Sequence, residues 1–196
     1  MLFRSFVRGY EMQILSQGSA PLTAALGGSQ GERVPWGAGH HREFQERFGH
    51  IAGIIIMTED LPEEHNRVTL DPEMTDSNGI PAAKIRYTIS ENTDKMLGHG
   101  VERAKEVMDA AGAKKVLWSH QRRNAGWHLL GTARMGEDPA TSVVDRWGRA
   151  HDVPNVFIID GSIFVTGACV NPTPTIQALA LRTADYLKGE GRSILE

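Results

Sequence analysis

The sequence has a single cysteine, no long apolar run and no excess of positive charge. Cys169 alone cannot form an intramolecular disulfide, which is typical of a reducing compartment. The longest strongly apolar run, IAGIIIM at 51–57, is far shorter than the roughly 20 residues that cross a bilayer. A net charge of -3 provides no basic surface for nucleic acid or an anionic membrane. We therefore expect neither a membrane span nor a nucleic-acid partner.

The N-terminal residues also lack the apolar core of a secretory signal, because Arg4 and Arg8 interrupt them. The compartment stays unknown on these grounds, with the cytoplasm as the default expectation. The chain has 196 residues, of which 40% are hydrophobic, and this is enough to bury one core or two. A globular protein of one or two domains is the simplest expectation.

Hydrophobic periodicity and turn residues predict an antiparallel sheet with covering helices, followed by a strand and a helix. Residues 16–40 are rich in glycine, serine and alanine and are expected to form a long loop. The expected elements are a helix at 41–50, a buried strand at 50–60, paired strands at 66–73 and 82–90, a helix at 91–112, a strand at 114–120, a buried strand at 156–160 and a helix from Pro174 to about Lys188.

Two segments of the last third could carry chemistry. GWHLLGTARMG at 126–136 places His128 among glycines and small residues. IDGSIFVTGACVNPTPTIQALA at 159–180 leads from an Asp-Gly turn to a helix start, where free N–H groups and the helix dipole suit an anionic group. Each segment alone has an ordinary structural explanation, since a turn at Asp160, a helix cap at Thr173 and a structural histidine are all common.

Taken in order, these segments resemble a known family. H-x-x-G-T-x-R-M-G, SVVD, VFIIDGS and VNPTPTIQALALRTADYL together resemble the C-terminal signature of the glucose-methanol-choline (GMC) flavoprotein oxidoreductases, gluconate-dehydrogenase-like branch. PWGAGHHREF and the segment from MTEDLPEEHNRVTLDPE to GIPAAKIRY are similar to that branch's substrate domain. The resemblance extends over nearly the whole chain and implies oxidation of a CH–OH donor, such as a sugar, polyol or other alcohol, with FAD as cofactor.

The resemblance also implies roles for individual residues. His128 matches the histidine that takes the hydroxyl proton while hydride moves to the flavin, and Asn171 matches its hydrogen-bonding partner. Asp160 and Gly161 match the pair beside the FAD diphosphate and ribityl chain. Pro172 and Thr173 lie where the helix start approaches the flavin. Gly131 and Gly136 would let the backbone pass close to this flat cofactor. Histidine and asparagine suit these roles chemically, because imidazole titrates near neutral pH and a carboxamide donates a hydrogen bond without titrating.

The family's N-terminal G-x-G-x-x-G dinucleotide motif has no match here, since GAGHHR and GHGVER both lack the third glycine. We expect a C-terminal portion of a longer enzyme. Residues 1–120 would form a partial substrate-binding domain, and residues 121–196 the segment that completes an FAD-binding domain. The expected consequences are weak or absent FAD binding and association through the apolar sides of 156–160 and the last helix. The alternative is a non-catalytic fragment or subunit that needs a separate FAD-binding partner.

Other candidate residues are given structural roles. The histidines at 40, 41 and 50 lack metal-ligand spacing, so no metal site is expected. Ser162 does not lie in a nucleophile elbow. The substrate and the electron acceptor, whether oxygen, a quinone or a cytochrome, are not encoded in these patterns. Structural roles are expected for Arg134, Met135, His99, His120 and His151.

Overall fold

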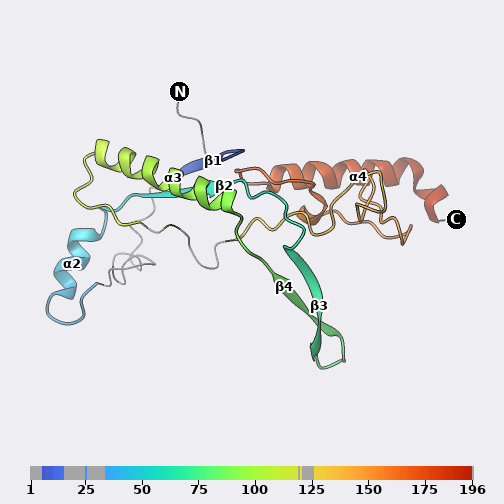
Figure 1. Ribbon diagram of the computed structural model, residues 1–196, viewed down its shortest axis with the longest axis horizontal. Coiled ribbons are helices and arrows are strands. Elements are labelled where there is room, and N and C mark those ends of the chain that lie inside the picture. The colour runs from blue at the N-terminus through green and yellow to red at the C-terminus, as the bar shows by residue number, and fades with distance from the viewer. Residues whose placement is uncertain (1–5, 16–24, 26–33, 119, 121–125, 196) are drawn as a thin grey trace. The chain divides into compact units, whose positions relative to one another are not determined.

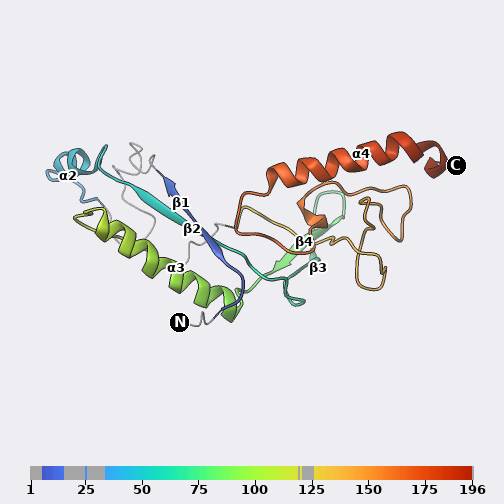
Figure 2. The same ribbon diagram turned by 90° about the horizontal axis from the view of Figure 1, so that it is seen from above.

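The computed structural model describes residues 6–15, 25, 34–118, 120 and 126–195, and the chain falls into two compact units (Figures 1 and 2). Unit 1 comprises 1–58 and 92–125, and unit 2 comprises 59–91 and 126–196. The α+β class is as expected, but the described residues form two separate two-stranded antiparallel sheets in place of the single predicted sheet. No helix in the described part of the chain is long and apolar enough to cross a membrane.

In unit 1, helix α3 (Glu91–Ala110) packs on the antiparallel pair of β1 (Tyr10–Leu15) and β2 (Gly53–Thr58), as Figure 2 shows. A Cβ at Gly100 would lie 2.8 Å from Ile56 Cγ2, so only glycine permits this approach. Glycine inside a helix costs about 1 kcal/mol relative to alanine, which the close packing here offsets. Met96 and Val101 are buried beside it on α3. The predicted strand at 50–60 is therefore β2, although its residues are only partly buried.

Both ends of α3 are held by specific hydrogen bonds. Near its start, the Asn92 side chain accepts from Val7 N (2.8 Å) and donates to Val7 O (3.1 Å), as a paired strand would. At its end, Ala113 N donates to Met108 O, and Gly112 has φ +79°. This is a Schellman ending, so the glycine stop predicted at 112 is confirmed. The predicted helix at 41–50 is also confirmed, as α2 (His40–Arg47).

The strand predicted at 114–120 is wrong for the residues that the structure describes there, 114–118 and 120. Instead of pairing with a strand, this segment contacts α3 through a cation–π interaction and a hydrogen bond between side chains. Lys105 Nζ lies 5.2 Å from the Trp118 ring centre, and His120 Nε2 lies 2.8 Å from Asp94 Oδ1. Branched and aromatic residues favour a strand only where a neighbouring strand offers hydrogen bonds.

In unit 2, β3 (Arg67–Thr75) and β4 (Pro81–Arg86) form the antiparallel hairpin that the sequence predicted. Gly79 turns the chain with φ +79°, and Asp76 Oδ1 accepts the Asn78 and Ile80 N–H groups. Val68 faces Ile85 in the register, and both are about half exposed or more, at 48% and 71%. Among the described residues of unit 2, these side chains therefore lack the helical cover that the sequence predicted.

Residues 131–163 fold without regular strands, around the fully buried Val144. Gly136 N donates to Val144 O (2.9 Å), and Val144 forms isolated bridges with Met135 and Ala150. The buried strand predicted at 156–160 is wrong, because Val156 is 44% exposed and this segment makes only single bridging contacts. Its apolar run lacks the neighbouring strands, among the described residues, that would extend a ladder.

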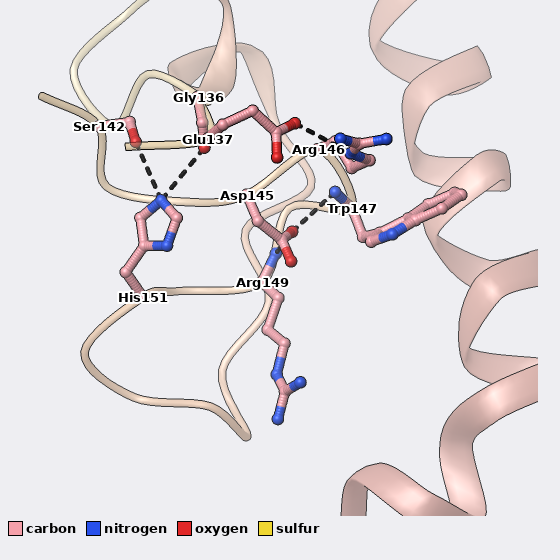
Figure 3. A network of polar contacts seen from close by, with 8 residues as sticks. All are labelled: Gly136, Glu137, Ser142, Asp145, Arg146, Trp147, Arg149 and His151. Atoms are coloured by element: carbon pink, nitrogen blue, oxygen red, sulfur yellow. Dashed lines mark hydrogen bonds and ion pairs between the residues drawn. The ribbon is translucent and has the colours of Figure 1, made fainter. Parts of the chain in front are cut away.

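A tight turn at Asp145 fastens this segment to α4 (Thr173–Leu195), as Figure 3 shows in part. Asp145 Oδ1 accepts the N–H groups of Trp147 (2.7 Å) and Arg149 (3.0 Å). The Trp147 ring stacks on Tyr186 of α4, with ring centres 4.6 Å apart. Trp147 O also accepts from Thr183 Oγ1 (2.9 Å). An aromatic stack and a buried hydrogen bond thus join the turn to the helix.

Helix α4 continues beyond Gly189, where the sequence predicted its end. Gly189 is not among the glycines with positive φ, and a glycine ends a helix only in the left-handed conformation. One side of α4 is the inner one. Ile176, Leu179, Ala180 and Thr183 on this side are half-buried or buried, whereas Leu181 is 68% exposed.

His151 forms hydrogen bonds with both ends of the loop between residues 136 and 142 (Figure 3). Its Nε2 lies 2.9 Å from Ser142 Oγ and 3.2 Å from Gly136 O. Ser142 Oγ donates its own proton to Asp138 O (2.6 Å), and a carbonyl only accepts. The ring must therefore carry hydrogen on Nε2, and this contact persists when the ring is protonated.

We predict that Gly148→Ala lowers the free energy of unfolding by at least about 2 kcal/mol. Gly148 has φ +78°, and a Cβ there would lie 2.5 Å from the Ile158 carbonyl oxygen. Urea unfolding followed by circular dichroism measures the loss. Gly189→Ala is the matched control, since a Cβ meets open space there and should raise stability by up to about 1 kcal/mol. Equal midpoints for the two variants would contradict the account of the turn.

We also predict that His151→Phe costs about 1–2 kcal/mol, because the partly buried acceptors at Ser142 and Gly136 lose their donor. His151→Gln keeps an N–H donor and should lose less. The same unfolding measurement compares the two variants, and a phenylalanine variant as stable as the glutamine variant would show that the hydrogen bonds contribute nothing.

Candidate functional site

The segment that carries His128 lies beside the segment that carries Asp160 and Gly161. Ala133 N donates to Ser162 O, and Met135 N donates to Ile163 O, both at 2.9 Å. His128 is exposed, as are Trp127 (70%) and Leu129 (76%) on either side of it. The histidine ring is therefore accessible to a ligand.

Gly161 is the point where three segments meet. A Cβ on this buried residue would lie 2.7 Å from Leu130 Cδ2, 3.2 Å from Leu129 O and 3.3 Å from Ile176 Cδ1. These atoms belong to the His128 segment and to the first turn of α4. The structure thus brings together the segments that hold all six predicted site residues.

Asp160 fixes the turn at this point. Its Oδ1 accepts the Ser162 N–H (2.8 Å) at the start of the short helix η2 (Gly161–Ile163). Hydrogen bonds from the Ser162 side chain and backbone lower the pKa of the Asp160 carboxyl. Asp160 is exposed, so its ionised carboxylate can also accept a hydrogen bond from a ligand hydroxyl.

Asn171, Pro172 and Thr173 form the start of α4. Ile176 N donates to Pro172 O, so Thr173 is the first helical residue and not the capping residue that the sequence predicted. Proline occupies positions 172 and 174 and has no N–H, which leaves Thr173 and Thr175 as the donors of the first turn. Asn171 and Thr173 are exposed. This helix start can therefore offer N–H donors and a carboxamide to an electron-rich group.

The glycines near His128 permit close contacts within the protein itself. The expected reason was an approach to a flat cofactor. A Cβ on Gly131, which has φ +84°, would lie 3.3 Å from Phe164 O, and one on Gly136 would lie 2.9 Å from Ser142 Cβ. The protein's own chain occupies these close approaches. Glycine is required here for packing within unit 2.

A cleft of about 120 Å³ lies beside the start of α4. Its lining combines apolar side chains, two small residues and the hydroxyls of Thr166 and Thr175. Thr166 Oγ1 donates to Glu59 Oε1 (3.4 Å), a residue 107 positions earlier. Local sequence patterns indicate neither the cleft nor Glu59, because no local pattern relates residues so far apart.

The remaining candidates have structural contacts, as expected. Arg134 Nε donates to Thr141 O (2.7 Å), and His99 Nδ1 lies 2.8 Å from Tyr10 O–H. His40 Nδ1 lies 3.1 Å from Pro35 O. Within the described ranges, no three His, Cys, Asp or Glu side chains form a group that could hold a metal ion.

The residues around Gly161 fit one edge of a flavin but do not supply a diphosphate site. The α4 N–H groups and the Asn171 carboxamide suit the electron-rich oxygen and nitrogen atoms of its pyrimidine ring. The Asp160 carboxylate suits a hydroxyl of the ribityl chain and would repel a diphosphate. The donor set is thus compatible with FAD only if phosphate-binding groups come from elsewhere.

Comparison with known proteins identifies the family of the chain. Residues 62–180 match the family model described as GMC oxidoreductase. The 2-methyl-1,2-propanediol dehydrogenase of Mycolicibacterium austroafricanum is 41% identical over 98% of this chain and 35% of its own length. The fructose dehydrogenase large subunit of Gluconobacter japonicus is 33% identical over 74% of the chain and 26% of its length. The gluconate 2-dehydrogenase flavoprotein of Pantoea cypripedii is 27% identical over 80% and 28%.

The matched relatives are much longer proteins, of which this chain spans about a third or less, and it corresponds to their C-terminal part. The family model covers more than half of the chain, and the first relative covers almost all of it. The chain therefore belongs to the GMC oxidoreductase family, whose members include gluconate and fructose dehydrogenase subunits.

Proposed function

We propose that this chain carries the substrate side and the catalytic pair of an FAD-dependent oxidoreductase that acts on a CH–OH donor. The observation that supports it most is the meeting of the His128 segment, the Asp160–Gly161 turn and the α4 start around Gly161. The relatives' names support the substrate class, since they include a diol, fructose and gluconate dehydrogenases. A sugar, polyol or other alcohol is the proposed donor.

In the proposed reaction, the alcohol loses its hydroxyl proton and the hydride of the same carbon, and a carbonyl forms. A nitrogen of the His128 imidazole accepts the proton, because histidine can act as a base near neutral pH. The Asn171 carboxamide donates a hydrogen bond to the alcohol oxygen and so orients the reacting carbon. A bound FAD would supply the acceptor for the hydride, and oxygen, a quinone or a cytochrome would take up the electrons.

The cofactor contacts in this proposal come from five residues. Asp160 accepts from a ribityl hydroxyl, and buried Gly161 keeps the turn close to Leu130. Thr173 supplies a backbone N–H at the positive end of α4. Asn171 and Pro172 set the direction in which the chain enters the helix. Residues 1–120 are proposed as part of a substrate-binding domain and residues 121–196 as a segment that completes an FAD-binding domain.

The alternative is a non-catalytic fragment or subunit that functions only beside a separate FAD-binding polypeptide. Two observations favour this alternative. The Asp160 carboxylate lies at the proposed cofactor turn, and large apolar side chains of unit 2 are exposed. Among these are Trp127, Leu129, Val165, Val170 and Leu181.

We predict that the purified chain binds FAD weakly or not at all, because its sequence shows no G-x-G-x-x-G motif to bind the diphosphate. Titration followed by flavin fluorescence should show no saturation up to high micromolar FAD, and His128→Ala should behave identically. Tight, saturable binding would show that the chain holds the cofactor without a partner and would contradict this part of the proposal.

We further predict that any FAD-dependent dye reduction with an alcohol falls at least about 100-fold in His128→Ala, which lacks the base. Asn171→Ala should also lose activity, whereas Asn171→His should retain much of it, because an imidazole N–H can replace the carboxamide donor. Steady-state assays with excess FAD compare the variants. Unchanged activity in His128→Ala would reject the proposed base, and an inactive parent chain would support the non-catalytic alternative.

A further inference from the structure

We propose that Asn78, in the turn of the β3–β4 hairpin, is a site of spontaneous deamidation, and that its isoaspartyl product loosens the hairpin. Asparagine followed by glycine favours a tight turn, and it also leaves the asparagine side chain open to attack by the next backbone nitrogen, because glycine has no Cβ. This modification is independent of the function proposed above, since the hairpin holds none of the proposed site residues.

The reaction needs neither an enzyme nor a cofactor. The Gly79 backbone nitrogen loses its proton and attacks the side-chain carbonyl carbon of Asn78, so that a carbon–nitrogen bond forms and ammonia leaves. Water then opens the resulting cyclic imide at either of its two carbonyl carbons. Opening at one carbon yields aspartate. Opening at the other yields isoaspartate, in which the main chain runs through the side-chain methylene, and no atom is oxidised or reduced.

The structure leaves both reacting residues accessible. Asn78 and Gly79 are exposed. No hydrogen bond holds the Asn78 carboxamide within the part of the chain that the structure describes, because the partner of this residue, Asp76 Oδ1, is bound to its backbone N–H. A Cβ at Gly79 would meet nothing within 4 Å, so no other side chain covers this residue. An unprotected asparagine in such a position is chemically labile.

One hydrogen bond opposes the reaction. Gly79 N donates to Asp76 O (3.1 Å), and this bond must open before the nitrogen can attack. Residues 72–81 are all exposed. Exposed backbone hydrogen bonds in a turn open far more often than a whole protein unfolds. The turn therefore slows the reaction without preventing it.

The other described asparagines are protected, for different reasons. Asn155 is equally exposed, but the β-branched side chain of Val156 crowds the attacking nitrogen. The carboxamides of Asn66 and Asn92 are each held by hydrogen bonds to the backbone of another segment. Asn171, the proposed orienting residue, precedes a proline, which has no N–H to lose. Deamidation should therefore be selective for Asn78.

Isoaspartate at position 78 would disturb the hydrogen bonds that close the turn. Asp76 N donates to Ile80 O (2.9 Å), and Asp76 Oδ1 accepts the N–H groups of Asn78 and Ile80. An additional main-chain methylene lengthens this turn, and a new carboxylate beside Asp76 repels it. The hairpin has no third strand among the described residues, and a two-stranded hairpin is only marginally stable in water. Its strand pairing should weaken as a result.

The experiment is prolonged incubation of the whole purified chain near neutral pH and at physiological temperature, followed by peptide mapping with mass spectrometry. Asn78 should be converted to aspartate and isoaspartate at least about tenfold faster than the equally exposed Asn155. Asn78→Gln should show no conversion at this position, because the longer side chain closes the required ring far more slowly. Conversion of Asn78 no faster than that of Asn155 would overturn the proposal.

NMR spectroscopy of the deamidated fraction, separated by anion exchange, tests the structural consequence. Cross-strand NOEs between Leu70 and Ala83, which are register partners, should fall at least about twofold for the isoaspartyl form, while the NOEs within α3 stay unchanged. Freshly prepared Asn78→Asp is the matched control, since it adds the charge without the methylene and should keep these NOEs. An isoaspartyl form with unchanged NOEs, or an equal loss in Asn78→Asp, would contradict the proposed loosening.

Discussion

The candidate site depends on one steric constraint, the absence of a side chain at Gly161. Leu130, the Leu129 carbonyl and Ile176 approach this residue so closely that even a methyl group would displace them. The approach holds the exposed His128 segment and the exposed start of α4 against the Asp160 turn. Hydrogen bonds from the Ala133 and Met135 N–H groups to η2 hold the His128 segment alongside the Asp160 turn. Gly148 imposes a similar constraint where the turn at Asp145 meets α4. A side chain there would collide with the Ile158 carbonyl.

Large apolar side chains remain exposed around this well-packed point. They occur beside His128, beside Asn171, on the outer side of α4 and on the β3–β4 hairpin. An isolated two-stranded hairpin is marginally stable in water, and monomeric proteins rarely expose such surface. Relatives of this chain are about three times as long or longer. We infer that these faces are the ones that further polypeptide would cover, whether in the same molecule or in a partner.

The sequence predicted local features well and long-range ones poorly. The helix at α3 and the β3–β4 hairpin follow from periodicity and from the turn residues Asn78 and Gly79, which act within a few positions. Strands expected at 114–120 and 156–160 do not form among the described residues, since a strand needs a neighbour that no local pattern guarantees. The motif order placed His128 and Asp160 on segments that do meet, but the cleft and the Glu59–Thr166 contact depend on residues far apart in the chain. Gly131 and Gly136 were correctly singled out for close approach, yet what approaches them is protein.

The central claim is that the three segments converge at Gly161, and methyl-selective NOE spectroscopy of the chain tests it most directly. The account predicts strong NOEs from a Leu130 methyl to both the Gly161 α-protons and the Ile176 δ-methyl, whose carbons surround the missing Cβ position. These contacts should be present without any ligand, because packing and not a cofactor creates them. Their absence in a folded sample, with the α3 and hairpin NOEs intact, would contradict the convergence and the site built upon it.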